Sequence, residues 1–264
     1  MGKASRIKAE KRKAPPPVGK QQGVSQRTVV FITIGVIVVI VAGAVAYSQL
    51  KSSPKAPPPA AASAADKSAP ASLVKAANAI GFSPRTEAGV GQIESQPASA
   101  AQAPSNPNLL PVGSTAPGFT LTTPAGQSVS LSSFRGKATL LEFFATWCPH
   151  CDAEAPHIRS IFSTLPRAKY GWLSVNADGE DAASVYAYHR YFGIRDPAVL
   201  DIGTGGATGS FTSPGSPGPV TTKYQVQAFP TFYVLDPKGK ITWTSDGEQP
   251  DALIRQQLAK AAGA

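Results

Sequence analysis

The chain has 264 residues and a formal net charge of +9, but this charge is concentrated at one end. Residues 1–27 carry eight Lys or Arg side chains against a single acidic residue, Glu10, so the tail holds +7 and the rest of the chain only +2. The basic balance therefore describes a cytoplasmic tail and excludes a basic nucleic-acid-binding groove as the main feature. We expect no nucleic-acid partner.

An uncharged, mostly apolar run follows this tail, TVVFITIGVIVVIVAGAVAY at 28–47. Twenty helical residues at about 1.5 Å each span about 30 Å, the thickness of the hydrocarbon core of a bilayer. Ala44 and Ala46 also fit the cleavage site of a signal peptide, although the run is longer than such segments usually are. Both interpretations export the rest of the chain, and we expect an uncleaved, single-pass anchor in the cytoplasmic membrane with a cytoplasmic N-terminus.

The next segment, 48–108, is rich in small and turn-forming residues. Ala, Ser and Pro make up 35 of its 61 residues, and Phe82 is its one aromatic residue. Such a composition buries too little apolar surface to offset the entropy of ordering. We expect a flexible extracytoplasmic linker and do not count the SLVKAANAIGF stretch at 72–82 as an element.

Residues 109–264 are predicted to form one folded domain. Runs of β-branched and aromatic residues predict strands, and helical apolar spacing predicts three helices between and after them. This alternation, which closes with a hairpin and a helix, predicts an α/β sandwich. Seventeen of the twenty residues at 203–222 are Gly, Pro, Ser or Thr, which predicts a long loop. The expected strands are 119–123, 128–131, 138–147, 170–177, 198–202, 230–236 and 241–245, and the expected helices are 149–165, 181–193 and 250–262.

Both cysteines of the chain lie in the sequence WCPHC, at Cys148 and Cys151. A strand that leads directly into this motif, followed by a helix, places Cys148 at a helix N-terminus, where amide N–H groups and the helix dipole favour a thiolate. Pro149 suits the first helical turn. We therefore expect Cys148 to be an exposed nucleophile and Cys151 to be a more buried, resolving cysteine.

His150 places an imidazole beside Cys148. Its positive charge would stabilise the thiolate and with it the reduced form, so the pair would become more oxidising. A metal site is the alternative, since His157 lies two helical turns from His150. However, a structural zinc site needs four ligands, and there is no second C-x-x-C. His157 and His189 are interpreted as a helix-surface residue and a solvated or half-buried residue.

The residues around the motif resemble the membrane-anchored thioredoxin-like proteins of the TlpA/ResA group. The resemblance covers about residues 110–262 and rests on PVGSTAPGFTLTTPAGQSVSLSSFRGKATLLEFFATWCPHCDAEAP and AFPTFYVLDPKGKI. It implies an α/β thioredoxin-like fold with an extra N-terminal β-hairpin and an inserted helix–strand unit. The implied activity is thiol-disulfide exchange by an oxidoreductase.

The resemblance also implies roles for individual residues. Cys148 and Cys151 match the redox pair, and Trp147 matches the tryptophan beside it. Pro230 matches a cis-proline that faces the disulfide, although Phe229-Pro230 also fits an ordinary proline before a strand. Glu142 matches a buried acid that helps to deprotonate the resolving cysteine, and the alternative is a solvated Glu at a strand edge.

The direction of electron flow stays open at this point. Pro149-His150 is the dipeptide of the periplasmic disulfide oxidants, whereas TlpA/ResA-like proteins mostly act as reductants. The expected partners are thiols or disulfides of exported proteins and a membrane or extracytoplasmic electron partner that recycles the pair. No cofactor beyond the Cys148–Cys151 disulfide is required, and no metal is expected.

Three other functions compete with this interpretation. A peroxiredoxin has a similar lead sequence but needs Pro-x-x-x-Thr/Ser-x-x-Cys, and the residues three positions before the two cysteines are Ala145 and Cys148. A copper-binding metallochaperone on the same fold uses C-x-x-x-C, whereas this chain has C-x-x-C. An inert docking module would have no need of a paired dithiol.

Overall fold

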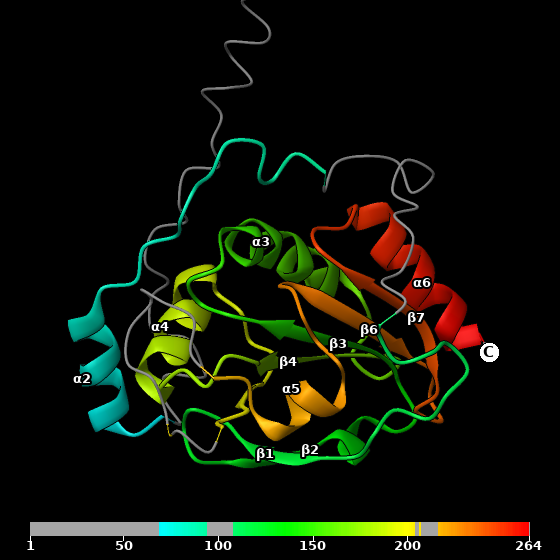
Figure 1. The fold of residues 1–264 in the computed structure, drawn as a ribbon, viewed down its shortest axis with the longest axis horizontal. Helices are drawn as coiled ribbons and strands as arrows, with labels where there is room; N and C mark the ends of the chain where they lie inside the picture. The colour runs from blue at the N-terminus through cyan, green and yellow to red at the C-terminus, as the bar shows by residue number, and fades with distance from the viewer. Residues whose placement is uncertain (1–68, 94–107, 204–205, 207–215, 264) are drawn as a thin grey trace, which may run out of the picture. The chain divides into compact units, whose positions relative to one another are not determined.

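A computed structural model of the chain describes residues 69–93, 108–203, 206 and 216–263 (Figure 1). A seven-stranded sheet with the order β2-β1-β5-β4-β3-β6-β7 forms its centre. Strand β3 pairs with β4, and β4 with β5, in parallel, while the other neighbours are antiparallel. The strands are β1 (Thr120–Thr122), β2 (Ser128–Ser130), β3 (Ala138–Phe144), β4 (Tyr170–Asn176), β5 (Ala198–Leu200), β6 (Thr231–Leu235) and β7 (Ile241–Asp246).

Helices cover both faces of this sheet, as Figure 1 shows. The expected N-terminal hairpin, β1–β2, and the inserted helix–strand unit, α4–β5, are both present. The 3-10 helix η2 and the short helix α5 were not predicted. The helices are α2 (Ala71–Ile80), η2 (Leu131–Phe134), α3 (Pro149–Thr164), α4 (Ala182–Phe192), α5 (Pro219–Lys223) and α6 (Asp251–Gly263).

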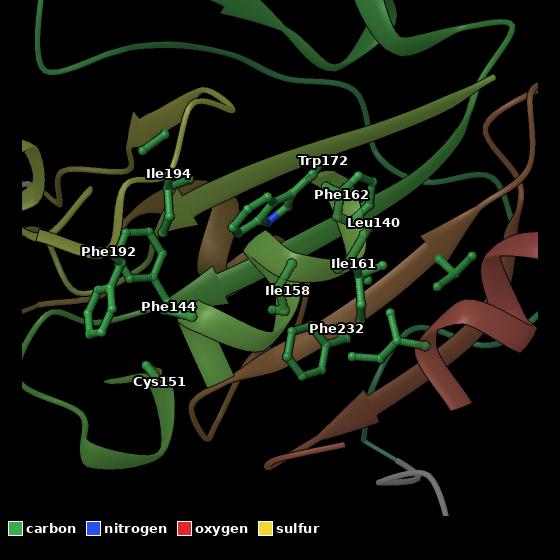
Figure 2. Close-up of a cluster of buried hydrophobic side chains, with 14 of the residues drawn as sticks. Leu140, Phe144, Cys151, Ile158, Ile161, Phe162, Trp172, Phe192, Ile194 and Phe232 are labelled. Carbon is green, nitrogen blue, oxygen red and sulfur yellow. The ribbon is translucent and has the colours of Figure 1, made fainter. Parts of the chain in front are cut away.

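Strand β3 is buried along its whole length because both of its faces are covered. Leu140 and Phe144 face the cluster formed with α3, α4 and α6, whereas Leu141 and Phe143 face the cluster formed with η2 and α5. Figure 2 shows the first cluster, with Cys151 at its edge near Phe144. The chain thus leaves the centre of the core at the C-terminal end of β3 and leads directly into the redox motif.

Part of the expected flexible linker is instead folded onto the domain. Helix α2 packs against α4, where Ala77 is buried against Tyr186 and Ala187. Phe82 follows α2 and makes edge-to-face contacts with the rings of Tyr188, Tyr191 and Phe192. The linker prediction is therefore wrong for residues 69–93. A few apolar side chains at helical spacing are enough to hold α2 in place, because the surface of α4 is complementary to them.

The end of the expected 203–222 loop is also structured. Pro219–Lys223 forms α5, and the carboxylate of Asp201 accepts hydrogen bonds from the N–H groups of Val220 and Thr221. A Cβ at Gly218 would lie 2.3 Å from the Asp201 carboxyl, so this close approach requires glycine. Residues 204–205 and 207–215 of the loop lie outside the described residues.

The basic tail and the expected membrane span at 28–47 also lie outside the described residues. Within the described part of the chain, no helix has both the length and the apolar character needed to cross a bilayer.

Candidate active site

The redox motif lies where β3 ends and α3 begins. Cys148 caps the N-terminus of α3, and its Sγ accepts a 3.4 Å hydrogen bond from the backbone N–H of Cys151. The same sulfur lies 3.5 Å from the carbonyl oxygen of Phe229. Cys151 is fully buried, as expected, but Cys148 is only 4% exposed. The expectation of an exposed Cys148 is therefore wrong, because its side chain turns back toward the helix end and the Phe229 carbonyl.

The two thiols differ in acidity. The pKa of Cys148 is lowered by its hydrogen bond with the Cys151 thiol, by the Cys151 N–H and by the charge of His150, despite the opposing effect of burial. The pKa of Cys151 is raised well above its ordinary value, first by burial and then by the nearby Cys148. Cys148 is thus the member of the pair that ionises, as a nucleophile or leaving group requires.

His150 is paired with an acid from a distant part of the chain. Its Nδ1 contacts the carboxylate of Glu248, which lies in the loop between β7 and α6. This pairing raises the pKa of His150, with a smaller opposing effect of burial. The second oxygen of Glu248 accepts a 2.8 Å hydrogen bond from the N–H of Gly91. Sequence reasoning missed Glu248, because nothing in its local sequence marks it as a partner of a residue 98 positions away.

Trp147 and Pro230 flank the cysteines, as the resemblance implied. The Trp147 indole N–H donates a 2.6 Å hydrogen bond to Asp178, and its ring meets the Phe229 ring edge-on at 6.0 Å. The Phe229–Pro230 bond is cis, as expected, and Pro230 is buried. Pro149 occupies the first turn of α3.

A buried carboxylate fixes the loop that precedes Cys148. Glu180 accepts hydrogen bonds from the backbone N–H of Thr146 at 2.7 Å, from the Thr146 hydroxyl and from the Asn176 amide at 2.5 Å. The pKa of Glu180 is raised, with burial as the largest cause. Glu180 was not predicted either, since a lone Glu after a strand usually lies on the surface.

Glu142 is buried in the middle of β3, on the same face as Leu140 and Phe144, so the solvated alternative is wrong. Its carboxylate accepts hydrogen bonds from the Trp172 indole at 2.8 Å and from the Ser174 hydroxyl at 2.9 Å. Burial outweighs both and raises the pKa of Glu142 to about 7. At neutral pH the group is balanced between its two protonation states, as a proton acceptor requires.

Asp152 is a second buried acid beside the motif. It is 4% exposed and follows Cys151 directly. Its Oδ2 accepts a 2.6 Å hydrogen bond from the backbone N–H of Arg85. Burial raises the pKa of Asp152 to about 8, with the nearby Cys148 as a smaller cause in the same direction. Sequence reasoning missed this contact, because Arg85 lies 67 positions before Asp152 in the chain.

The other two histidines lie apart from the redox pair. His157 is 3.3 Å from the carboxylate of Asp251 and is partly exposed, as expected. His189 is only 8% exposed, so the expectation of a solvated or half-buried residue is wrong, and its burial lowers the pKa to about 4. Among the residues that the structure describes, no three His, Cys, Asp or Glu side chains are grouped to hold a metal ion.

The comparison with known proteins agrees with this arrangement. Residues 112–244 match the AhpC/TSA family, which is half of the chain. The thiol-disulfide oxidoreductase ResA of Geobacillus kaustophilus is 32% identical over 147 residues, which cover 56% of this chain and 76% of that protein. The ResA of Bacillus subtilis is 27% identical over 146 residues, which cover 55% and 73%.

Among solved structures, a protein from Chlorobium tepidum that bears the name thiol:disulfide interchange protein DsbE superposes with a TM-score of 0.50. It is 23% identical, and the match covers 58% of this chain and 99% of that one. At this identity the likeness shows the fold alone, which is thioredoxin-like.

Proposed function

The chain belongs to the AhpC/TSA family and is a thiol-disulfide oxidoreductase of the ResA type, and we propose that it exchanges electrons with cysteines of exported proteins through Cys148 and Cys151. The observation that carries this proposal is that the pKa values of the two thiols are shifted in opposite directions. The pKa of Cys148 is lowered and that of Cys151 is raised. One thiol is thereby suited to form a mixed disulfide and the other to resolve it.

The proposed direction is oxidation of the substrate. A substrate thiolate attacks Cys148 Sγ of the oxidised pair, the Cys148–Cys151 bond breaks, and Cys151 leaves with the electron pair and takes a proton. A second substrate thiolate then attacks the substrate sulfur of the mixed disulfide and releases Cys148 as a thiolate. The substrate has lost two electrons, and the Cys148–Cys151 pair has gained them. Glu142, with a pKa of about 7, is proposed to give Cys151 this proton and to take it back when the pair is reoxidised.

The support for this direction is the stabilised thiolate of Cys148. The hydrogen bond with the Cys151 thiol is the largest cause of the lowered pKa of Cys148, and the imidazolium of His150, which Glu248 favours, lowers it further. A stabilised thiolate favours the reduced pair, and each pKa unit contributes about 30 mV to a more oxidising potential. An electron partner outside the chain then has to reoxidise the pair, and no cofactor besides the disulfide is proposed.

The proposed location is the outer side of the cytoplasmic membrane, with 28–47 as a single-pass anchor. The support is the length of that apolar run and the basic tail before it. Because the chain has only two cysteines, a membrane-impermeant maleimide added to intact cells, after the pair is reduced with an impermeant phosphine, reports the side on which the domain lies. Labelling without lysis supports an extracytoplasmic domain, and labelling only after lysis contradicts it.

The exchange reaction is tested by trapping the mixed disulfide. In the full chain, Cys151→Ser leaves Cys148 without the thiol that would displace a bound substrate. The Cys148 thiolate can still attack the disulfide of an oxidised substrate, which is the reverse of the proposed oxidation, so covalent adducts that dithiothreitol releases should accumulate. Cys148→Ser is the matched control and should form few or none, because its remaining thiol is fully buried. Equal adduct formation by both variants, or none by either, would contradict the assigned roles.

A further inference from the structure

Residues 82–91, which we call the strap, lie upstream of the part of the chain that matches the family and contact the first turn of α3. In Figure 1 the segment leaves α2 and passes over α3. Its backbone N–H groups at Arg85 and Gly91 donate to the side chains of Asp152 and Glu248. A Cβ built at Gly91 would lie 3.4 Å from that of Ala153, so the strap backbone is in van der Waals contact with the helix.

The two carboxylates that the strap holds are both tied to the redox motif. Glu248 pairs with the imidazole of His150, which is two residues from Cys148. Its side chain is 8% exposed, whereas that of His150 is 49% exposed, so the acid is the fixed member of the pair. Asp152 belongs to the first turn of α3, directly after Cys151. A chain of contacts thus runs from the strap backbone through Glu248 to His150, whose charge acts on the Cys148 thiol.

The strap is itself anchored away from the site. The ring of Phe82 lies 5.2 Å from those of Tyr188 and Tyr191 and 5.7 Å from that of Phe192, measured between centroids. Helix α2, just before the strap, packs on α4. Phe82 therefore helps to fix the positions of the Arg85 and Gly91 N–H donors, although its ring contacts are with Tyr188, Tyr191 and Phe192 and not with the cysteines.

We propose that the strap is a positioning element of the active site, which holds Glu248 and Asp152 by its backbone and thereby sets the charge of His150 beside Cys148. The inference rests on the proposed function, because His150 matters only if Cys148 carries the chemistry. It assigns to a segment outside the matched family domain a direct influence on the acidity of the redox cysteine.

Three acidic groups face His150. They are Glu248 from the β7–α6 loop, Glu87 from the strap, and the Cys148 thiolate on the helix itself, and all three raise the pKa of the imidazole. When the strap opens, Glu87 moves away and Glu248, no longer held by the Gly91 N–H, turns from His150 into water, so the imidazolium becomes less favoured. Asp152 loses the Arg85 donor and gains water, which favours a carboxylate beside Cys148. Both changes disfavour the Cys148 thiolate.

The test uses the full chain with Phe82→Ala, which removes the anchor and leaves every side chain that faces His150 unchanged. Three quantities are measured: hydrogen exchange of the Arg85 and Gly91 amides, the His150 pKa by NMR, and the alkylation rate of Cys148 by iodoacetamide at pH 6. The chain has only three histidines, so their signals can be assigned by single substitutions. Val112→Ala, at a side chain 59% exposed to solvent, is the matched control.

We expect the two amides to lose protection in Phe82→Ala, the His150 pKa to fall toward its ordinary value of about 6.5, and alkylation to slow by about threefold or more. Val112→Ala should change none of the three. An opened strap with an unchanged His150 pKa and an unchanged alkylation rate would overturn the proposal.

If the amides remain protected in Phe82→Ala, the same readouts are taken on Gly91→Pro, which removes the donor to Glu248 and also displaces the strap backbone, because proline cannot adopt the φ of +76° found at Gly91. An unchanged His150 pKa there also overturns the proposal. The titration does not depend on turnover. A wild-type chain that fails to exchange disulfides contradicts the proposed function, whereas an active chain whose strap variants titrate like the wild type contradicts only the role of the strap.

Discussion

The indole N–H of Trp172 on β4 donates a 2.8 Å hydrogen bond to the carboxylate of Glu142 on β3, between the sheet and α3. Ser174, also on β4, donates a second hydrogen bond at 2.9 Å. Both favour the ionised carboxylate, but burial in the core disfavours it more strongly, and the pKa rises to about 7. Trp172 and Ser174 thus hold a carboxyl group whose pKa is near neutrality and whose charge acts on the buried Cys151 thiol.

Loss of either donor should raise the pKa of Glu142 further. Trp172→Phe removes the indole N–H while keeping an aromatic ring against Phe162, and Ser174→Ala removes the hydroxyl. Each leaves a buried acceptor with one partner fewer and should cost about 1–3 kcal/mol of stability at pH 8. Carboxyl NMR titration and urea unfolding measure the two effects. A pKa that falls in both variants would contradict this account of the site.

Glu142→Gln should change the pH dependence of stability. The folded-state pKa of Glu142 is raised, so its contribution is fully present below about pH 4.5 and is lost as the pH rises through about 7. The wild type should therefore lose about 2–3 kcal/mol relative to Glu142→Gln between pH 4.5 and pH 8. Unfolding curves of both proteins at several pH values test this. Parallel pH profiles would show that Glu142 ionises freely in the folded protein.

The same substitution should slow the step that Cys151 performs. Without a proton acceptor, attack of Cys151 on a mixed disulfide at pH 7 should slow by about 10- to 100-fold. The first step, in which Cys148 forms the mixed disulfide, should keep its rate and serves as the internal control. Stopped-flow measurement of both steps with a chromophoric disulfide separates them. An equal loss in both steps would point to a distorted site instead.

His189 should make the protein acid-sensitive. Its folded-state pKa is lowered to about 4, so the stability it contributes is present above about pH 6.5 and is lost as the pH falls toward 4. His189→Gln should flatten the stability curve in this range by about 2–3 kcal/mol relative to the wild type. Thermal unfolding between pH 4 and pH 7 compares the two proteins, and parallel curves would contradict the buried, neutral imidazole.

The approach of α5 to Asp201 should tolerate no side chain at position 218. Gly218→Ala places a Cβ 2.3 Å from the Asp201 carboxyl, and the displacement of that carboxyl breaks the hydrogen bonds to Thr221. The expected cost is about 2–3 kcal/mol. Gly118→Ala adds a Cβ that meets nothing within 4 Å and should be nearly neutral. Equal denaturation midpoints for the two variants would contradict the assigned contact.

The sheet and the redox motif could be predicted because their determinants are local. The strand before WCPHC is apolar apart from Thr139 and Glu142, and Pro149 begins a helix. Phe229 and Pro230 lie in the AFPTFYVLDPKGKI stretch on which the resemblance rests. Each strand that was expected is present within a few residues of its predicted bounds. Chain order and apolar pattern suffice for such elements, because each of them is specified by its own residues.

The surroundings of the cysteines could not be predicted, because they depend on contacts between distant segments. Arg85 precedes the motif in the chain and Glu248 follows it, each by more than 60 positions. Glu and Arg side chains are usually expected to be solvated, so neither residue stood out. Helix α2 is stabilised by the surface of α4, which a linker composition does not reveal. The low exposure of Cys148 follows from the direction of its side chain toward Phe229, which local pattern does not encode.

The central claim is that the Cys148–Cys151 pair is redox-active and that its stabilised Cys148 thiolate makes it an oxidant. The most direct test is the reduction potential of this pair in the full chain, measured by equilibration with glutathione and thiol trapping. We predict a value above about −200 mV, toward the roughly −120 mV of the strongest known protein oxidants. A value at or below about −270 mV would contradict the oxidant direction, and the absence of any redox transition would contradict disulfide exchange altogether.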